Sequence, residues 1–275
     1  MGFIDSHVHV WTDDLAAYPL APGFARADMA PATYPPECIL GDARPCGVDR
    51  VVLVQMSYYG TDNAYMLDTM RAHPGVFGGI AVIDADSDEV EAEMARLGAQ
   101  GVRGFRIQPR GGAADTWLEG PGMARMFAEG ARSGQAMCCL INPDALPALD
   151  RMCAAYPDTP VVIDHLCRIG VEGEIAEADV AALCALARHG NVKVKVSAFY
   201  ALGRKRPPHD ELVPLIRRVH EAFGAQRLMW ASDCPFQVRD ESYEDGLALV
   251  RDRCDFLSAE DQAWLLWRTA EATFF

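Results

Sequence analysis

Two histidines near the start of the chain have a spacing that can do chemistry. His7 and His9 close the apolar run FIDSHVH at residues 3–9. Side chains two positions apart in an extended strand point to the same face, so we expect Asp5, His7 and His9 on one face, with both imidazoles at the C-terminal end. Two imidazoles placed in this way can bind one metal ion or polarise one substrate carbonyl.

Two further polar residues close apolar runs later in the chain. His165 ends the run VVIDH, and Asp233 ends LMWASD shortly before Pro235. If all these runs are parallel strands of one sheet, their C-terminal ends lie at the same edge. The sequence then predicts a reactive centre made of His7, His9, His165 and Asp233. The alternative is structural: His165 bonds to a loop, and Asp233 caps a turn before the proline.

Eight short apolar runs are expected to position these side chains, with helical segments between them. This alternation is typical of a parallel sheet with helical crossovers. Eight strands predict a closed (β/α)8 barrel, or TIM barrel, which residues 1–275 are long enough to form as a single domain. The predicted strands are residues 3–9, 50–55, 77–83, 102–107, 136–141, 161–165, 192–197 and 228–233.

The segments between the strands divide into helices and long loops. The predicted helices include 87–97, 177–189, 210–223 and 258–272. The last of these begins with a capping-box sequence at Ser258, and we expect its tryptophans to pack against the barrel. Residues 11–36 and 198–209 are predicted to be loops at the C-terminal ends of strands, where active sites of such barrels lie.

The composition narrows the class of partner. A formal net charge of −14 disfavours nucleic acid and anionic membranes, which both require a basic face. The nine cysteines include no CxxC pair, which favours free thiols over disulfides. We expect no signal peptide, because residues 1–10 lack a basic start followed by an apolar run, and no apolar stretch reaches the ~20 residues needed for a membrane span. We therefore expect a cytoplasmic protein, monomeric or homodimeric, that acts on a small molecule.

Several polar residues near predicted strand ends could bind that molecule. Arg106 shares the inward parity of Gly104 and Gln108, so its guanidinium could grip a carboxylate or form a buried ion pair. The other candidates are Gln55, Ser57, Tyr58 and Tyr59 after the second strand, Lys195 and Ser197 at the end of the seventh, and Arg168. Packing or turn roles are the alternative for these residues.

Basic residues after the sixth and seventh strands could favour an anionic substrate. Arg168 and the cluster Arg204-Lys205-Arg206 would add positive potential near the mouth of an acidic protein; an ordinary exposed loop is the alternative. We predict no role for the remaining histidines and expect them at the surface: His73, His189, His209 and His220.

The order of these motifs resembles a known enzyme family. The HxH of the first strand, the strand-end His165 and the SDCP sequence at Asp233 are similar to the amidohydrolase superfamily, in the branch with 2-pyrone-4,6-dicarboxylate hydrolase and sugar-acid lactonases. The segments GVDRVVLVQ (47–55), GTDN (60–63) and GVRGFR (101–106) support this resemblance. It implies a lactonase that adds water to an ester carbonyl, with Asp233 as general base and the histidines polarising the carbonyl.

The resemblance leaves the role of a metal open. Metal-dependent members carry a histidine at the end of the fifth strand and a lysine or glutamate at the end of the fourth, whereas this chain has Leu140-Ile141-Asn142 and Arg106-Ile107-Gln108 there. One zinc ion on His7, His9, His165 and Asp233 and catalysis without metal both stay possible. Two alternative functions are a zinc-dependent decarboxylase or amide hydrolase similar to the aminocarboxymuconate-semialdehyde decarboxylase branch, and a non-catalytic barrel that binds a small acid.

Overall fold

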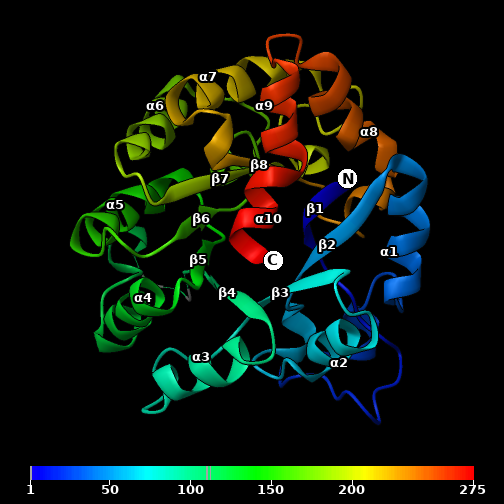
Figure 1. The fold of residues 1–275 in the computed structure, drawn as a ribbon, viewed down its shortest axis with the longest axis vertical. Helices are drawn as coiled ribbons and strands as arrows, with labels where there is room; N and C mark the ends of the chain where they lie inside the picture. The colour runs from blue at the N-terminus through cyan, green and yellow to red at the C-terminus, as the bar shows by residue number, and fades with distance from the viewer. Residues whose placement is uncertain (1, 110, 112) are drawn as a thin grey trace.

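The computed structural model describes residues 2–109, 111 and 113–275. Its eight parallel strands form one sheet in sequence order, β1 to β8, and helices surround them (Figure 1). The strands are β1 (Phe3–Val8), β2 (Val48–Val54), β3 (Phe77–Ala81), β4 (Val102–Ile107), β5 (Ala136–Cys139), β6 (Val161–Ile163), β7 (Val192–Ser197) and β8 (Leu228–Ala231). The predicted (β/α)8 barrel is confirmed.

The helices follow the strands around the barrel. They are α1 (Pro36–Ala43), α2 (Ala64–Ala72), α3 (Val90–Gly98), α4 (Pro121–Ser133), α5 (Leu146–Ala155), α6 (Glu177–Ala185), α7 (Val213–Phe223), α8 (Tyr243–Ala248), α9 (Ala259–Ala263) and α10 (Thr269–Phe274). The predicted capping box is present at Ser258, whose side chain accepts a hydrogen bond from the Asp261 amide. Within the described residues, no helix has both the length and the apolar character required to cross a membrane.

Backbone hydrogen bonds between the first and last strand regions close the barrel. The Asp233 amide donates to the His7 carbonyl at 3.0 Å, and the His9 amide donates to the Cys234 carbonyl at 2.8 Å. These bonds lie at the C-terminal ends of β1 and β8. Closure therefore brings two of the predicted reactive segments side by side.

The C-terminal helix enters the bottom of the barrel. Phe274 packs with Ile4, Val52 and Met229 in the inner core, and α10 ends near the centre of the barrel in Figure 1. Gly78 makes room for it, because a Cβ there would lie 2.9 Å from the Phe274 carbonyl oxygen. The interior below the mouth is therefore filled by side chains.

Several strands are shorter than predicted at their C-terminal ends. The expected strands ran to His165 and Asp233, whereas β6 ends at Ile163 and β8 at Ala231. His165 has a φ of 56° and Asp233 a φ of 67°, and neither angle is compatible with an extended strand. These residues instead open the loops at the mouth.

Candidate active site

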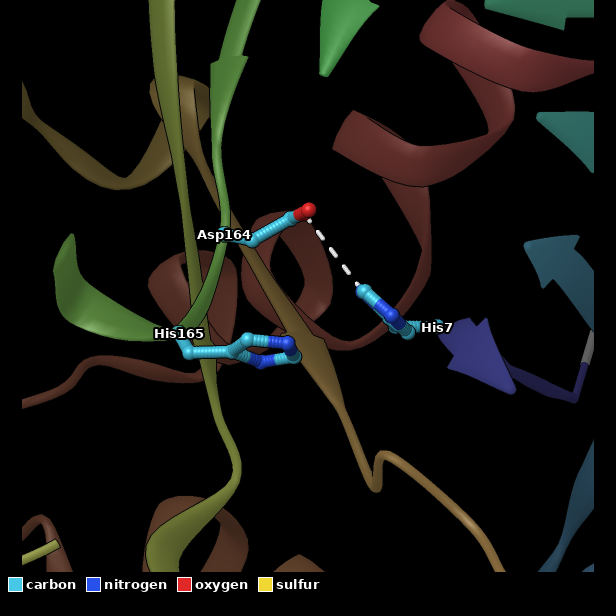
Figure 2. Close-up of side chains that lie close together, drawn as sticks. All are labelled: His7, Asp164 and His165. Atoms are coloured by element: carbon cyan, nitrogen blue, oxygen red, sulfur yellow. Dashed lines mark ion pairs between the residues drawn. The ribbon is translucent and has the colours of Figure 1, made fainter. Parts of the chain in front are cut away.

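Polar side chains from five strand ends converge at the mouth of the barrel. Figure 2 shows His7 from β1 facing Asp164 and His165, which follow β6. His9, Arg106, Lys195, Tyr200 and Asp233 complete the cluster. The four residues predicted as the reactive centre therefore lie together, and sequence reasoning missed Asp164 and Tyr200.

Asp233 lies among the three imidazoles. Its Oδ1 is 3.5 Å from Nε2 of both His7 and His9, and its Oδ2 is 3.8 Å from Nε2 of His165. Oδ2 also accepts a hydrogen bond of 2.7 Å from the Tyr200 hydroxyl, whereas the buried Oδ1 has no hydrogen-bond partner. Asp233 therefore has one fixed oxygen and one that is free to accept a proton.

The ionisation of Asp233 is controlled by its surroundings. Burial acts to raise the pKa of this carboxyl, but the nearby imidazoles of His165, His7 and His9 outweigh burial and hold the pKa below its usual range. Asp233 is therefore a carboxylate at neutral pH.

The hydrogen bonds of His9 define its tautomer. Its Nδ1 lies 2.9 Å from the Val54 carbonyl oxygen, and because a carbonyl oxygen only accepts, Nδ1 carries the proton. The lone pair on Nε2 therefore faces the cluster. The Nδ1 of His165 is bonded to the Ser197 hydroxyl at 2.9 Å, which leaves its Nε2 facing Asp233.

Two cations, the buried Lys195 and the partly buried Arg106, flank His7. Lys195 Nζ lies 3.2 Å from His7 Nδ1, and Arg106 Nη2 lies 2.7 Å from His7 Nε2. Burial and the Lys195 charge hold the pKa of His7 well below its ordinary value, so the ring is neutral. Because a guanidinium only donates, His7 accepts from Arg106 through Nε2.

Asp164 neutralises part of this positive charge. Its two oxygens lie 3.0 Å from Lys195 Nζ and 3.0 Å from Arg106 Nη2. Burial acts to raise the pKa of Asp164, but Lys195, His7 and Arg106 hold it well below its ordinary value. Arg106 thus forms the ion pair that was one of the two interpretations of the sequence, and it also lines the cavities at the mouth.

Left-handed backbone conformations occur where the reactive side chains project. Residues His165 to Arg168 have φ values of 51–57°, and Ala198 and Asp233 have φ values of 55° and 67°. Each such non-glycine residue costs about 1–2 kcal/mol, and strain of this kind concentrates at functional sites. The turn at His165 allows the consecutive residues Asp164 and His165 to face the same cluster, which a regular strand would not permit.

Two adjoining cavities lie above the cluster. The first, here called the catalytic lobe, has a volume of about 340 Å³ and is lined by His9, Arg106, His165, Arg168, Tyr200 and Asp233 together with apolar neighbours. The second, here called the apolar lobe, has a volume of about 400 Å³. Both share His9, Arg106, Leu140 and Phe236 in their walls.

The predicted substrate-binding residues lie in different parts of the site. Arg168 lines the catalytic lobe, and Gln55 and Ser57 line the apolar lobe. Lys195 lies below the lobes and has no exposed surface.

Tyr58 and Tyr59 belong to neither lobe. Their hydroxyls bond to the backbone of Asp28 and Thr12, so they attach the 11–36 loop to the barrel.

Two expectations from the sequence were wrong. Asp5 does not share the face of the imidazoles, because a register shift lies between Asp5 and Val8; its carboxylate instead accepts from Ser232 and Tyr243. His209 is buried and bonded to Glu241 at 2.8 Å. The Arg204-Lys205-Arg206 cluster is exposed and lines neither lobe, which agrees with the ordinary exposed loop that the sequence also allowed.

Comparison with known proteins identifies the family. A family model described as amidohydrolase matches residues 4–275. The chain belongs to the amidohydrolase family. It is 30% identical to an L-fucono-1,5-lactonase of Burkholderia ambifaria over 222 residues, and this alignment covers 79% of this chain and 77% of the relative. It is 27% identical to a 2-pyrone-4,6-dicarboxylate hydrolase of Comamonas testosteroni over 256 residues, and this alignment covers 90% of this chain and 81% of the relative.

A solved structure supports the same fold. An amidohydrolase from Burkholderia multivorans, crystallised with zinc, superposes with a TM-score of 0.86 over 99% of each chain at 22% identity. The family model and the curated relatives confirm the predicted family resemblance. Both curated relatives are named as hydrolytic enzymes, which supports the prediction of an enzyme.

The donor set in the amidohydrolase mouth fits a single divalent metal. His7, His9 and Asp233 each offer a ligand atom within 4.8 Å of the others, and so do His7, Asp164 and His165. Imidazole nitrogen and carboxylate oxygen are ligands that zinc accepts, and the unpartnered Asp233 Oδ1 is suited to such a role. Arg106 already faces the same nitrogen of His7, so the guanidinium and a metal compete for it.

Proposed function

We propose that this amidohydrolase hydrolyses a small carboxylated lactone. The observation that carries the proposal is the unpartnered, ionised Oδ1 of Asp233, which lies in a cavity beside three imidazoles and a guanidinium. A carboxylate in this position can accept a proton from an attacking water. The lactone-hydrolysing relatives support the choice of a cyclic ester.

In the proposed reaction, Asp233 and His9 position a water molecule. The water donates one hydrogen bond to Asp233 Oδ1 and the other to His9 Nε2, whose lone pair faces the cavity. Its oxygen attacks the ester carbonyl while Asp233 takes its proton. The hydroxyl of Tyr200 keeps the other oxygen of Asp233 in place.

Arg106 and His165 stabilise the charge that develops on the carbonyl oxygen. Arg106 is oriented by His7 and Asp164, and His165 can donate from Nε2 when its Nδ1 accepts from Ser197. Donors fixed in advance around an oxyanion contribute strongly to catalysis. Collapse of the intermediate breaks the bond to the ring oxygen, which receives the proton from Asp233. His7 acts here as a positioning residue.

A divalent metal would be held by His7, His9 and Asp233, with His165 beside them. When bound, such an ion polarises the carbonyl and lowers the pKa of a coordinated water.

Arg168 is proposed to bind the substrate carboxylate. It lines the catalytic lobe, and its guanidinium has no ion pair or hydrogen bond to the described part of the chain. An unpaired guanidinium binds carboxylates in a bidentate manner. Arg106 is less suited to this task, because Asp164 already neutralises its charge.

The test is a panel of carboxylated lactones assayed with a pH indicator, with carbon dioxide release from aromatic acids measured in parallel. Ring opening without decarboxylation is expected. Carbon dioxide release alone would favour the decarboxylase alternative, and binding without turnover would favour a non-catalytic barrel. Elemental analysis and chelation of the same preparation decide whether a metal takes part.

A further inference from the structure

The apolar lobe opens directly beside the catalytic residues. It shares His9, Arg106, Leu140 and Phe236 with the catalytic lobe, and its volume is about 400 Å³. Ligand cavities typically measure about 300–1,000 Å³, so the lobe has room for a sizeable substituent. A ring held against Asp233 would have direct access to this space.

The walls of the apolar lobe are mainly hydrocarbon. Its apolar lining includes Met56, Ile83, Met123, Met126, Leu140 and Phe236. The amide of Gln55 also lines it, but its NH2 group already donates to the Asp62 carbonyl oxygen at 2.6 Å. The other polar side chains in its wall are His9, Ser57, Arg106 and Gln108. Hydroxyl groups placed against the apolar side chains would lose hydrogen bonds to water without replacing them, at a cost in binding.

An exposed aromatic side chain stands at this lobe. Phe24, in the 11–36 loop, keeps 38% of its surface exposed, and the only other large apolar side chain as exposed in the described chain is Phe275 at 40%. Phe24 lines the apolar lobe and packs edge-on against Tyr58 with ring centroids 5.6 Å apart. An exposed apolar ring at a cavity gains burial when an apolar ligand binds.

We propose that the substrate carries an alkyl or aryl substituent that fills the apolar lobe, while its carboxylate binds Arg168. The inference rests on the proposed lactone hydrolysis and narrows the substrate class. It selects apolar-substituted carboxylated lactones over polyhydroxylated sugar-acid lactones.

The test compares lactones of one ring size that differ only in the substituent. A carboxylated γ-lactone series runs from methyl to hexyl and phenyl, and a polyhydroxylated sugar-acid lactone of the same ring size is included. Burial of each added methylene is expected to raise kcat/KM about fourfold until the lobe is full, since a buried methylene contributes about 0.8 kcal/mol.

Two variants locate the effect in the apolar lobe. Phe24→Ala and Met123→Gln are expected to lower kcat/KM for the hexyl lactone at least tenfold and for the methyl lactone less than threefold. Phe275→Ala removes the other exposed aromatic, outside the mouth, and is the matched control.

The outcomes separate this inference from the proposed function. Faster turnover of the polyhydroxylated lactone, or equal losses for hexyl and methyl substrates in the variants, would overturn the inference and leave lactone hydrolysis standing. Failure to open any lactone in the series would overturn both.

Discussion

The Asp5→Asn variant is expected to gain stability relative to the wild-type protein as the pH rises from 4 to 7. Asp5 is fully buried and accepts hydrogen bonds from the Ser232 hydroxyl at 2.5 Å, the Ser232 amide at 3.0 Å and the Tyr243 hydroxyl at 2.8 Å. Burial nevertheless raises the pKa of Asp5 to about 6. The folded protein therefore holds a proton that the unfolded chain releases.

The raised pKa of Asp5 determines the sign and size of this effect. The pKa is 3.8 for an unperturbed aspartate and about 6 in the folded protein. The stabilisation by the bound proton is therefore complete below the unfolded pKa and is lost as the pH rises through the folded pKa. Two pKa units at about 1.36 kcal/mol each predict a loss of about 3 kcal/mol. Asparagine does not ionise, so Asp5→Asn avoids this loss.

Urea unfolding of the wild-type protein and Asp5→Asn at pH 4, 5, 6 and 7 measures the effect. The difference in free energy of unfolding between the two proteins cancels the titration of groups that both contain. It is expected to move by about 3 kcal/mol in favour of the variant as the pH rises. Asp158→Asn, at the surface, is the control. A difference that stays constant, or that moves the other way, would refute the reasoning.

Three other substitutions test the buried network. Lys195→Met leaves Asp164 without one of its cations and is expected to lower the free energy of unfolding by about 3–5 kcal/mol in urea; unchanged stability would contradict the buried pair. Tyr200→Phe removes the hydrogen bond to Asp233 and is expected to lower kcat about 10- to 100-fold, with little change in KM; a wild-type kcat would exclude this positioning role. Glu241→Ala leaves a buried histidine unpaired and is expected to cost about 3 kcal/mol in the same unfolding assay.

The barrel and the four predicted reactive residues could be read from the sequence because each rests on a local pattern. The eight apolar runs alternate with helical periodicity, and a parallel barrel brings the C-terminal strand ends to one mouth. His7, His9, His165 and Asp233 each stood at or near such an end, so their meeting followed once the strands were assigned.

The missed and misplaced residues depend on backbone geometry that no local pattern encodes. The register shift after Asp5 turns that side chain away from the imidazoles, although strict alternation predicts the opposite. The left-handed turn at His165 brings Asp164 into the cluster. Two polar residues in succession at a strand end were the available signal for Asp164.

Long-range pairing explains the remaining differences. His209 is buried because Glu241, 32 residues later in the chain, bonds to it, and Tyr200 reaches Asp233 across 33 residues. Partners so distant in sequence are joined only by the fold. Tyr58 likewise attaches a loop, because its hydroxyl meets the backbone of Asp28.

The rate of ring opening of one carboxylated lactone by the wild-type protein and by Asp233→Asn tests the central claim. Circular dichroism establishes equal folded concentrations, and Asp240→Asn, an exposed aspartate of the same loop, is the matched control. Loss of the general base is expected to lower kcat about 10²- to 10⁴-fold, with the control at the wild-type rate. Turnover by Asp233→Asn within threefold of wild type would contradict the assignment of Asp233 as the base.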